Sequence, residues 1–286
     1  MEETLYSVVV NSEKQYSIWN TDKSLPIGWE EEGTKGTKED CLEHIKTIWS
    51  DIRPKSLMDY IERQIPKKKV VITQDQKDKH LEAIDTYKKR YSAGLDTWSG
   101  MDYLKKGIQI FFNDYTSLPS KDVFEIGIGT GRSSETVLEL GHSLTGIDVI
   151  ENDNWSILKE KYGEKFHAFV GDFTEYTRSK KYDIVLDNGC LHHFEPEYYE
   201  ITFHQIHHLL KSKGWFYLAV FKEDDTSVEE GRVEYIDGGK RRCKYFTKKE
   251  IAALFDHYGF TLKDTQEVSR SYDSLMTMLC IAQKQS

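Results

Sequence analysis

Hydrophobic and polar positions follow two different patterns along the chain. From residue 122 onward, short apolar segments are separated by longer segments with helical spacing, which predicts strands that alternate with helices. The predicted strands are Asp122–Ile126, Ser143–Asp148, His167–Val170, Tyr182–Leu186 and Trp215–Phe221, with a final pair near Phe260–Leu262 and Leu275–Ile281. Because helices lie between the first five, we expect an α/β fold with a parallel sheet covered on both faces.

The first 60 residues are organised differently. Ser7–Val10 and Gln15–Trp19 are expected to form two short strands joined by a polar turn. The segment Thr37–Trp49 has helical spacing, with Thr37 as its N-cap and Asp40 three positions later. A small α+β unit is therefore expected at the front of the chain.

Glycine, proline and charge mark the boundaries between these parts. Gly33 and Gly36 are expected to flank a turn within the first unit. Pro66 opens a charged stretch that continues to Lys79 and is expected to be a linker. The sequence thus predicts a first domain at residues 1–62, a linker at 63–79 and a second domain at 80–286.

Composition narrows the class of protein. The net charge of −9 argues against a nucleic-acid binder, since phosphate contacts require a basic face. No apolar run approaches the roughly 20 residues that cross a bilayer, and Glu2 and Glu3 stand where a secretory signal would be basic. The four cysteines form no C-x-x-C pair, so neither a zinc site nor a disulfide framework is expected. We therefore expect a cytoplasmic protein without a metal and without membrane contact.

A glycine-rich turn follows the first strand of the second domain. Glu125 precedes Gly127, Gly129 and Gly131, which form a G-x-G-x-G turn that leads into a helix. Glycines let the backbone turn sharply and approach a ligand closely. The dinucleotide-binding motif G-x-G-x-x-G would have its third glycine at position 132, which is Arg132, so an NAD-linked oxidoreductase is disfavoured. The carboxylate of Glu125 before the turn suits a cationic ligand.

Two further carboxylates follow the next two predicted strands. Asp148 ends the second strand, where an acidic side chain can accept both ribose hydroxyls, and Asp172 follows the third, where it can accept from an adenine amino group. Either residue alone is more often a loop or cap residue, but the ordered set is specific. Residues 80–286 resemble the class I S-adenosylmethionine (SAM)-dependent methyltransferases. The resemblance implies a seven-stranded Rossmann-like sheet and SAM as the cofactor, bound by Glu125, the three glycines, Asp148 and Asp172.

A second group of polar residues follows the fourth strand. The resemblance places Asp187 and Asn188 near the transferred methyl group, with Asn188 in the cofactor site and Asp187 among the catalytic residues. By the same comparison, His192 and His193 line the acceptor pocket, and His192 is the favoured general base. Positioning alone is the alternative, because an in-line displacement does not require a base. We expect the polar segment Lys222 to Lys244 to cover the acceptor as a flap.

The front of the chain has a separate resemblance. Residue types that recur in order at the spacings of MbtH-like proteins are Asn11, Glu13, Gln15, Ser17, Trp19, Pro26, Gly28, Trp29, Gly33, Gly36, Cys41, Leu42, Trp49, Asp51, Arg53, Pro54, Ser56 and Leu57. The resemblance implies a three-stranded antiparallel sheet packed on a helix. It also implies binding to an adenylation domain of a nonribosomal peptide synthetase through Ser17, Trp19 and Trp29. The alternative for the two tryptophans is that they fill a small core.

Two functions remain open at this point. The first is a SAM-dependent methyltransferase for a small amino-acid-derived or carrier-bound acceptor in nonribosomal peptide biosynthesis, such as that of an antibiotic or siderophore, with a front domain that binds or activates an adenylation domain. The second is a non-catalytic MbtH-like activator in which the methyltransferase fold is a silent scaffold. The set from Glu125 to Asp148 favours the enzyme, because a scaffold needs no cofactor site.

Overall fold

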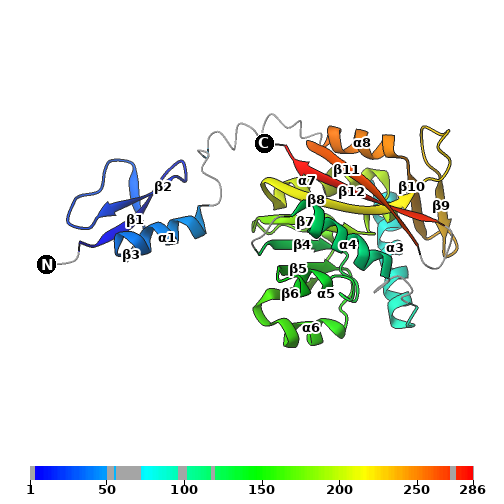
Figure 1. Cartoon of the computed structure of the whole chain (residues 1–286), viewed down its shortest axis with the longest axis horizontal. Coiled ribbons are helices and arrows are strands. Elements are labelled where there is room, and N and C mark those ends of the chain that lie inside the picture. The colour runs from blue at the N-terminus through cyan, green and yellow to red at the C-terminus, as the bar shows by residue number, and fades with distance from the viewer. Residues whose placement is uncertain are drawn as a thin grey trace. The chain divides into compact units, whose positions relative to one another are not determined.

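The chain forms two compact units. The computed structural model describes residues 4–49, 55, 72–95, 102–116, 120–270 and 275–285. Its contacts divide the chain into residues 1–69 and residues 70–286 (Figure 1). Each unit has its own hydrophobic core and is described by itself.

The first unit is a three-stranded antiparallel sheet with one helix. Strands β1 (Tyr6–Asn11), β2 (Tyr16–Asn20) and β3 (Trp29–Gly36) are arranged in the order β2-β1-β3, and α1 (Lys38–Ile48) packs on the sheet. This is the architecture that the resemblance to MbtH-like proteins implied. The N-cap prediction also holds, because Thr37 and Asp40 form a reciprocal capping box that satisfies free N–H groups of the first turn.

One prediction for this unit was wrong. Gly33 and Gly36 do not flank a turn but lie within β3. The pairing of β3 with β1 shifts register between Ser7 and Val9, which marks a bulge in β3. A bulged strand with two glycines lacks the strict alternation by which strands are recognised in a sequence.

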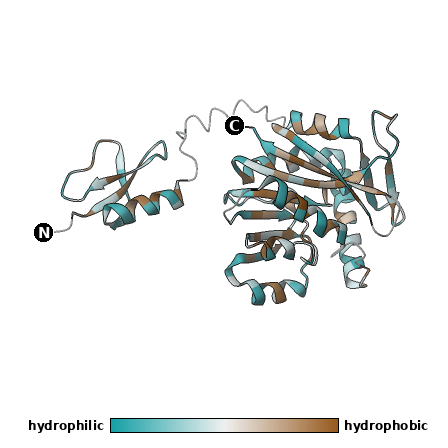
Figure 2. Ribbon diagram, viewed as in Figure 1, coloured by the Kyte–Doolittle hydropathy of each residue, from teal (hydrophilic) through white to brown (hydrophobic). Residues whose placement is uncertain are grey.

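The second unit is built on a large mixed sheet. Its strands are β4 (Asp122–Ile126), β5 (Ser143–Asp148), β6 (Phe166–Val170), β7 (Tyr182–Asn188), β8 (Leu210–Lys222), β11 (Phe260–Ser269) and β12 (Met276–Lys284). Their order is β11-β12-β8-β7-β4-β5-β6, in which β11 and β12 are antiparallel to their neighbours and the other pairs are parallel. All seven strands predicted from the apolar pattern are present. The hydrophobic positions concentrate in these central strands (Figure 2).

Helices cover both faces of the sheet. On one face, α7 (Tyr199–Leu209) and α8 (Lys248–His257) bury an apolar layer that includes Phe203 and Phe255. On the other face, α4 (Asp102–Tyr115), α5 (Glu135–Glu139) and α6 (Asn154–Tyr162) enclose a second layer that includes Phe111. The predicted α/β fold with both faces covered is therefore confirmed.

The second unit begins earlier than its predicted boundary at residue 80. Helix α3 (Gln74–Ser92) starts inside the stretch predicted as a linker, with Thr73 and Gln76 forming a capping box at its N-terminus. None of its residues is fully buried, so its sequence carries little apolar periodicity. The expected flap contains a β-hairpin formed by β9 (Val233–Ile236) and β10 (Arg241–Phe246), and it lies beside α3 in Figure 1.

Candidate functional site

A cavity of about 490 Å³ lies at the carboxyl ends of the parallel strands. In open α/β sheets, ligands bind at this edge, near the point where the strand order reverses. Here that point lies between β4 and β7. The cavity is lined by the glycine turn after β4, the ends of β5, β7, β8 and β12, and by α3, α4 and the β9–β10 hairpin.

The glycine turn after β4 requires glycine at two positions for different reasons. Gly127 has φ +65°, and a Cβ atom there would lie 2.6 Å from Sγ of Cys190. Gly131 has φ +75°, and a Cβ atom there would lie 2.7 Å from a methyl group of Leu158 in α6. Side chains at these positions would be strained and would clash, so the turn brings bare backbone to the cavity wall.

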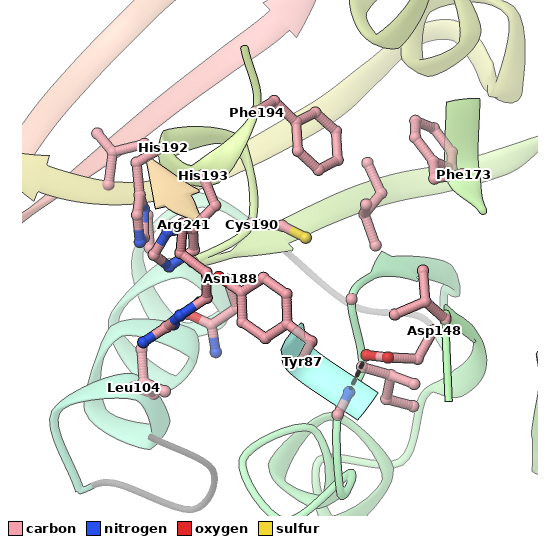
Figure 3. Close-up of a pocket in the computed structure, with 18 of the residues that line it drawn as sticks. Tyr87, Leu104, Asp148, Phe173, Asn188, Cys190, His192, His193, Phe194 and Arg241 are labelled. Carbon is pink, nitrogen blue, oxygen red and sulfur yellow. Dashed lines mark hydrogen bonds between the residues drawn. The ribbon is translucent and has the colours of Figure 1, made fainter. Parts of the chain in front are cut away.

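Asp148 fixes the turn from the neighbouring strand. Its Oδ2 accepts a hydrogen bond from the Gly129 N–H at 2.7 Å, and its Oδ1 accepts from the Ile150 N–H at 3.3 Å (Figure 3). The indole N–H of Trp155 donates to the Gly129 carbonyl at 2.8 Å on the other side. The turn is therefore held before any ligand binds, and a carboxylate remains at its edge.

Glu125 is the most unusual group in the site. Its side chain is 2% exposed and lines the cavity, and its Oε2 has no hydrogen-bond partner among the described residues. Burial raises the pKa of the Glu125 carboxyl to about 8, and the nearby carboxylates of Asp187 and Asp148 act in the same direction. An unpartnered buried carboxyl oxygen is costly, so this position is suited to a ligand that carries a cation.

The two residues at the end of β7 have different positions. Asn188 lines the cavity, and its Oδ1 is buried without a partner among the described residues. Asp187 does not line the cavity, and its carboxylate accepts hydrogen bonds from the N–H groups of Gly189, Cys190 and Leu191. The expectation that Asp187 is near the transferred methyl group therefore needs correction, because this side chain holds the loop after β7.

Asp172 lines the cavity, but its carboxylate is already engaged. Its Oδ1 accepts from the backbone and hydroxyl of Thr174, both at 2.8 Å, and its Oδ2 accepts from Nε2–H of His80 at 2.6 Å. Burial opposes ionisation of this carboxyl, but the His80 and Thr174 contacts outweigh it and lower the pKa. The sequence analysis missed His80, because it lies on α3 within reach of Asp172 only after folding.

His192 and His193 both line the far end of the cavity. Figure 3 shows them with Arg241 on the side opposite Asp148. The His192 ring stacks on Phe221 with ring centroids 3.8 Å apart, and its Nδ1 is buried without a partner among the described residues. Burial, together with the neighbouring His193 ring and nearby arginines, lowers the pKa of His192, so its ring is neutral at pH 7.

The tautomer of His193 follows from its contacts. Its Nδ1 lies 2.7 Å from the Arg242 carbonyl oxygen, which can only accept, so Nδ1–H is the donor and Nε2 carries the lone pair. Burial lowers the pKa of His193 to about 4, and Arg241 and Arg242 contribute in the same direction. Both histidines are therefore neutral near pH 7, and only His193 has an assigned lone-pair atom.

Polar contacts attach α3 to the hairpin at the acceptor end. Arg90 donates to Asp237 at 3.1 Å, and Lys240 pairs with Glu82 at 3.2 Å. Arg241 also pairs with Asp237 and lies over the ring of Tyr87 at 4.9 Å from its centroid. The sequence pattern assigned no individual role to these residues, although Asp237, Lys240 and Arg241 lie in the segment that was expected to form a flap.

The three predicted partner-binding residues of the first unit share one face of its sheet. Ser17 pairs with Val9, Trp19 with Ser7 and Trp29 with Asn11. Alternate residues of β1 point to opposite faces, so this set points away from Val8, which belongs to the core under α1. The two indoles are not members of that core, which removes the alternative that they fill it.

Comparisons with known proteins agree with this geometry. Residues 102–265 match the family described as a methyltransferase domain, and the chain belongs to this family. Residues 1–61 match the family described as MbtH-like protein. The chain therefore combines an MbtH-like domain with a SAM-dependent methyltransferase domain.

Individual relatives lie in the same family. The chain is 27% identical to an uncharacterized methyltransferase of Geobacillus sp. (strain WCH70) over 164 residues, 54% of this chain and 76% of the relative. Among solved structures, it is similar to the Burkholderia thailandensis 1,6-didemethyltoxoflavin-N1-methyltransferase with bound 1,6-didemethyltoxoflavin and S-adenosylhomocysteine. That similarity has a TM-score of 0.67 and 28% identity, and it covers 72% of this chain and 89% of the other. The glycopeptide N-methyltransferase MtfA complexed with SAM shares the fold, with a TM-score of 0.50 and 12% identity over 67% and 96% of the chains.

The described ranges contain neither a membrane-spanning helix nor a cluster of metal ligands. No helix there has both the length and the apolar character needed to cross a membrane. Within the same ranges, histidine, cysteine, aspartate and glutamate side chains do not gather in groups that could hold a metal ion.

Proposed function

We propose that the chain methylates a small amino-acid-derived or carrier-bound acceptor in nonribosomal peptide biosynthesis, and that its MbtH-like domain binds an adenylation domain. The observation that carries the enzymatic part is the buried Glu125 Oε2, which lacks a partner beside a preformed glycine turn. SAM supplies a methyl group on a positively charged sulfur and carries an ammonium group. The buried Glu125 carboxyl, whose Oε2 has no partner among the described residues, complements that ammonium group once it ionises on binding.

At the cofactor end, different residues are proposed to bind different parts of SAM. Glu125 and Asn188 offer oxygen acceptors to the amino-acid part of the cofactor, and Asp148 offers its carboxylate to the ribose hydroxyls. Gly127, Gly129 and Gly131 let the backbone approach. Asp172 remains the proposed contact at the adenine end, with His80 fixing the orientation of its carboxylate. Asp187 contributes by holding the loop that carries the histidines.

The acceptor end is formed by His192 and His193. Both rings are neutral at pH 7, so neither repels a cationic donor. The lone pair on Nε2 of His193 makes this residue the stronger candidate to accept a proton, and the low pKa makes it a weak base. We therefore propose that most of the catalysis comes from holding the acceptor in line with the methyl group, with the histidines as orienting groups.

A small acceptor is supported by the size of the cavity. About 490 Å³ lies in the range of roughly 300–1,000 Å³ typical of small-molecule sites. The Burkholderia relative, at 28% identity, was crystallised with 1,6-didemethyltoxoflavin, which is a small acceptor. The link to nonribosomal peptides rests on the MbtH-like domain alone.

The partner-binding proposal rests on the face opposite α1. Ser17, Trp19 and Trp29 are half-buried there, and tryptophans on a sheet face are typical interface anchors. We propose that an adenylation domain covers this face. We expect Trp29→Ala to abolish co-purification of a co-expressed adenylation domain, while Trp49→Phe, a change on the α1 side, preserves it. Co-purification that survives Trp29→Ala and Trp19→Ala would contradict the proposal.

Calorimetry with SAM tests the enzymatic proposal. Wild type is expected to bind SAM, and Asp148→Ala is expected to weaken binding at least tenfold, because the ribose contact and the brace on Gly129 are both lost. Free and carrier-bound amino acids offered with SAM are then screened for a mass increase of one methylene. No SAM binding by a folded wild-type protein would leave only the non-catalytic activator.

A further inference from the structure

Two buried polar atoms at the far end of the cavity have no partner among the described residues and are not explained by the cofactor site. They are Nδ1 of His192 and the hydroxyl of Thr277, and each side chain is 3% exposed and lines the cavity. Thr277 lies near the start of β12, and the sequence analysis did not select it. Buried polar groups normally find partners, so a ligand is expected to supply them here.

These atoms gather around the ring of Phe221. Thr277 is directly opposite Phe221 in the β12–β8 ladder, and such cross-strand neighbours project from the same face of a sheet. The His192 ring stacks on Phe221 at 3.8 Å between centroids. The guanidinium carbon of Arg270, which follows β11, lies 4.1 Å from the centroid of the same ring.

The three polar groups suit an anion. Arginine carries a permanent positive charge, threonine offers a rotatable O–H donor, and a neutral histidine can present an N–H. Charge is also separated along the cavity. Three carboxylates line the cofactor end beside Arg132, and Arg241 and Arg270 line the acceptor end beside Glu234, so cations outnumber carboxylates at the acceptor end alone (Figure 3 shows Asp148 and Arg241 on opposite sides).

We infer that His192, Arg270 and Thr277, arranged around Phe221, form a subsite that binds the carboxylate of the methyl acceptor. The inference rests on the proposed methyltransferase function and deepens it. A free amino acid or aromatic acid has this carboxylate, whereas an acceptor tethered to a carrier protein has a neutral thioester in its place. The subsite therefore selects the free acid over the carrier-bound form. The carboxylate anchors the acceptor and does not itself react.

The test uses the full chain loaded with S-adenosylhomocysteine and matched acid–amide probes. Three pairs are titrated by calorimetry: benzoate and benzamide, 3-hydroxybenzoate and 3-hydroxybenzamide, and L-tyrosine and L-tyrosinamide. We expect at least one acid to bind, and each acid that binds to do so at least tenfold more tightly than its amide. No acid that binds more tightly than its amide, including no binding by any probe, would overturn the subsite.

Variants then locate the binding. Thr277→Val keeps the shape of the side chain and removes the hydroxyl, and we expect it to weaken acid binding at least fivefold without changing amide binding. Arg270→Gln is expected to do the same, and Arg270→Lys to restore part of the preference. The matched control is Thr202→Val on α7, which removes another buried hydroxyl that has no hydrogen-bond partner among the described residues and lies away from the cavity. Acid binding that is unchanged in Thr277→Val and Arg270→Gln would overturn the assignment.

The outcome also separates this inference from the proposed function. Failure of S-adenosylhomocysteine to bind wild type would contradict the methyltransferase site itself. Normal S-adenosylhomocysteine binding without a preference for acids would contradict the carboxylate subsite alone. Thermal unfolding of each variant shows whether a loss reflects unfolding.

Discussion

The two ends of the cavity are built in different ways. At the cofactor end, one continuous segment supplies the turn, in which Glu125 leads through the glycines to Asp148 on the next strand, and Asp172 and Asn188 join it from the ends of later strands. The acceptor end brings together residues far apart in the chain, such as Tyr87 on α3, His193 after β7 and Arg241 on β10. The first end is acidic and centres on a hydrogen-bonded turn, and the second depends mainly on contacts between separate elements. The comparison shows that the first end depends on one turn and its bracing carboxylate, whereas the second depends on how α3 meets the hairpin.

The largest expected effect comes from Gly127→Ala at the cofactor end. The new Cβ would lie 2.6 Å from Sγ of Cys190 at a φ of +65°, so the backbone is strained and either the turn or the Cys190 side chain must shift. We expect SAM affinity to fall at least 100-fold in calorimetry. The control is Gly141→Ala, where φ is +89° but nothing lies within 4 Å of the new Cβ. Equal losses of SAM affinity in Gly127→Ala and Gly141→Ala would show that backbone strain in general, and not the geometry of the glycine turn, explains the result.

Glu125→Gln is expected to weaken SAM binding by about tenfold. The variant keeps the size of the side chain and removes its charge, which is worth about 1.4 kcal/mol for that ratio. The pKa of the free carboxyl is about 8, and a bound cation favours the ionised form. Wild-type affinity should therefore rise with pH up to about 8, with proton release from this group at pH 7. A pH profile that is the same in wild type and Glu125→Gln would contradict this role.

His80→Ala is expected to have a smaller effect, about fivefold on SAM affinity. It removes the hydrogen bond at 2.6 Å that attaches α3 to Asp172, and the effect is limited because Arg90 and Glu82 still attach the same helix to the hairpin. Amide exchange along α3 should accelerate as well. Lys89→Ala on the same helix removes only an exposed ion pair with Asp85 and serves as the control. Unchanged affinity and exchange in His80→Ala would show that the contact is dispensable.

The smallest expected effect on cofactor binding comes from the acceptor end. His193→Gln should leave SAM affinity within twofold of wild type, because its contacts, which include Arg242 and Tyr87, lie at the acceptor end and not at the glycine turn. The pKa of His193 is about 4, below its unfolded value of 6.5. Its contribution to stability is therefore present above pH 6.5 and is lost as the pH falls toward 4. An NMR titration of His193 with a midpoint near 6.5 would contradict the buried, neutral ring.

The sequence predicted some strands and helices more accurately than others. Strands β4 and β5 were predicted with their observed bounds, because they are apolar, regular and followed by an informative turn. Strand β3 was not predicted, because Gly33 and its bulge interrupt the alternation, and the first six residues of α3 were placed in a linker because they are polar. A local sequence pattern predicts a helix or strand when burial in the core determines which of its residues are apolar. The pattern fails when a bulge interrupts the strand or when polar contacts hold the helix in place.

The same distinction applies to the site. Glu125, Asp148 and Asn188 were predicted from their positions after strands, and all three line the cavity. Asp187 was predicted by its place in a motif, but the sequence could not show that its carboxylate would be used by the following loop. Thr277 was missed because nothing in the local sequence of β12 indicates that it lies opposite Phe221 at the cavity wall.

A crystal structure of the chain with SAM is the most direct test of the central claim, that the buried carboxyl beside the glycine turn binds the cationic cofactor. We expect the cofactor along the turn, with its amino nitrogen within hydrogen-bond distance of Glu125 Oε2 and its ribose hydroxyls at Asp148. A cofactor bound elsewhere, or a cavity along the glycine turn that is filled by the protein's own side chains, would contradict the account.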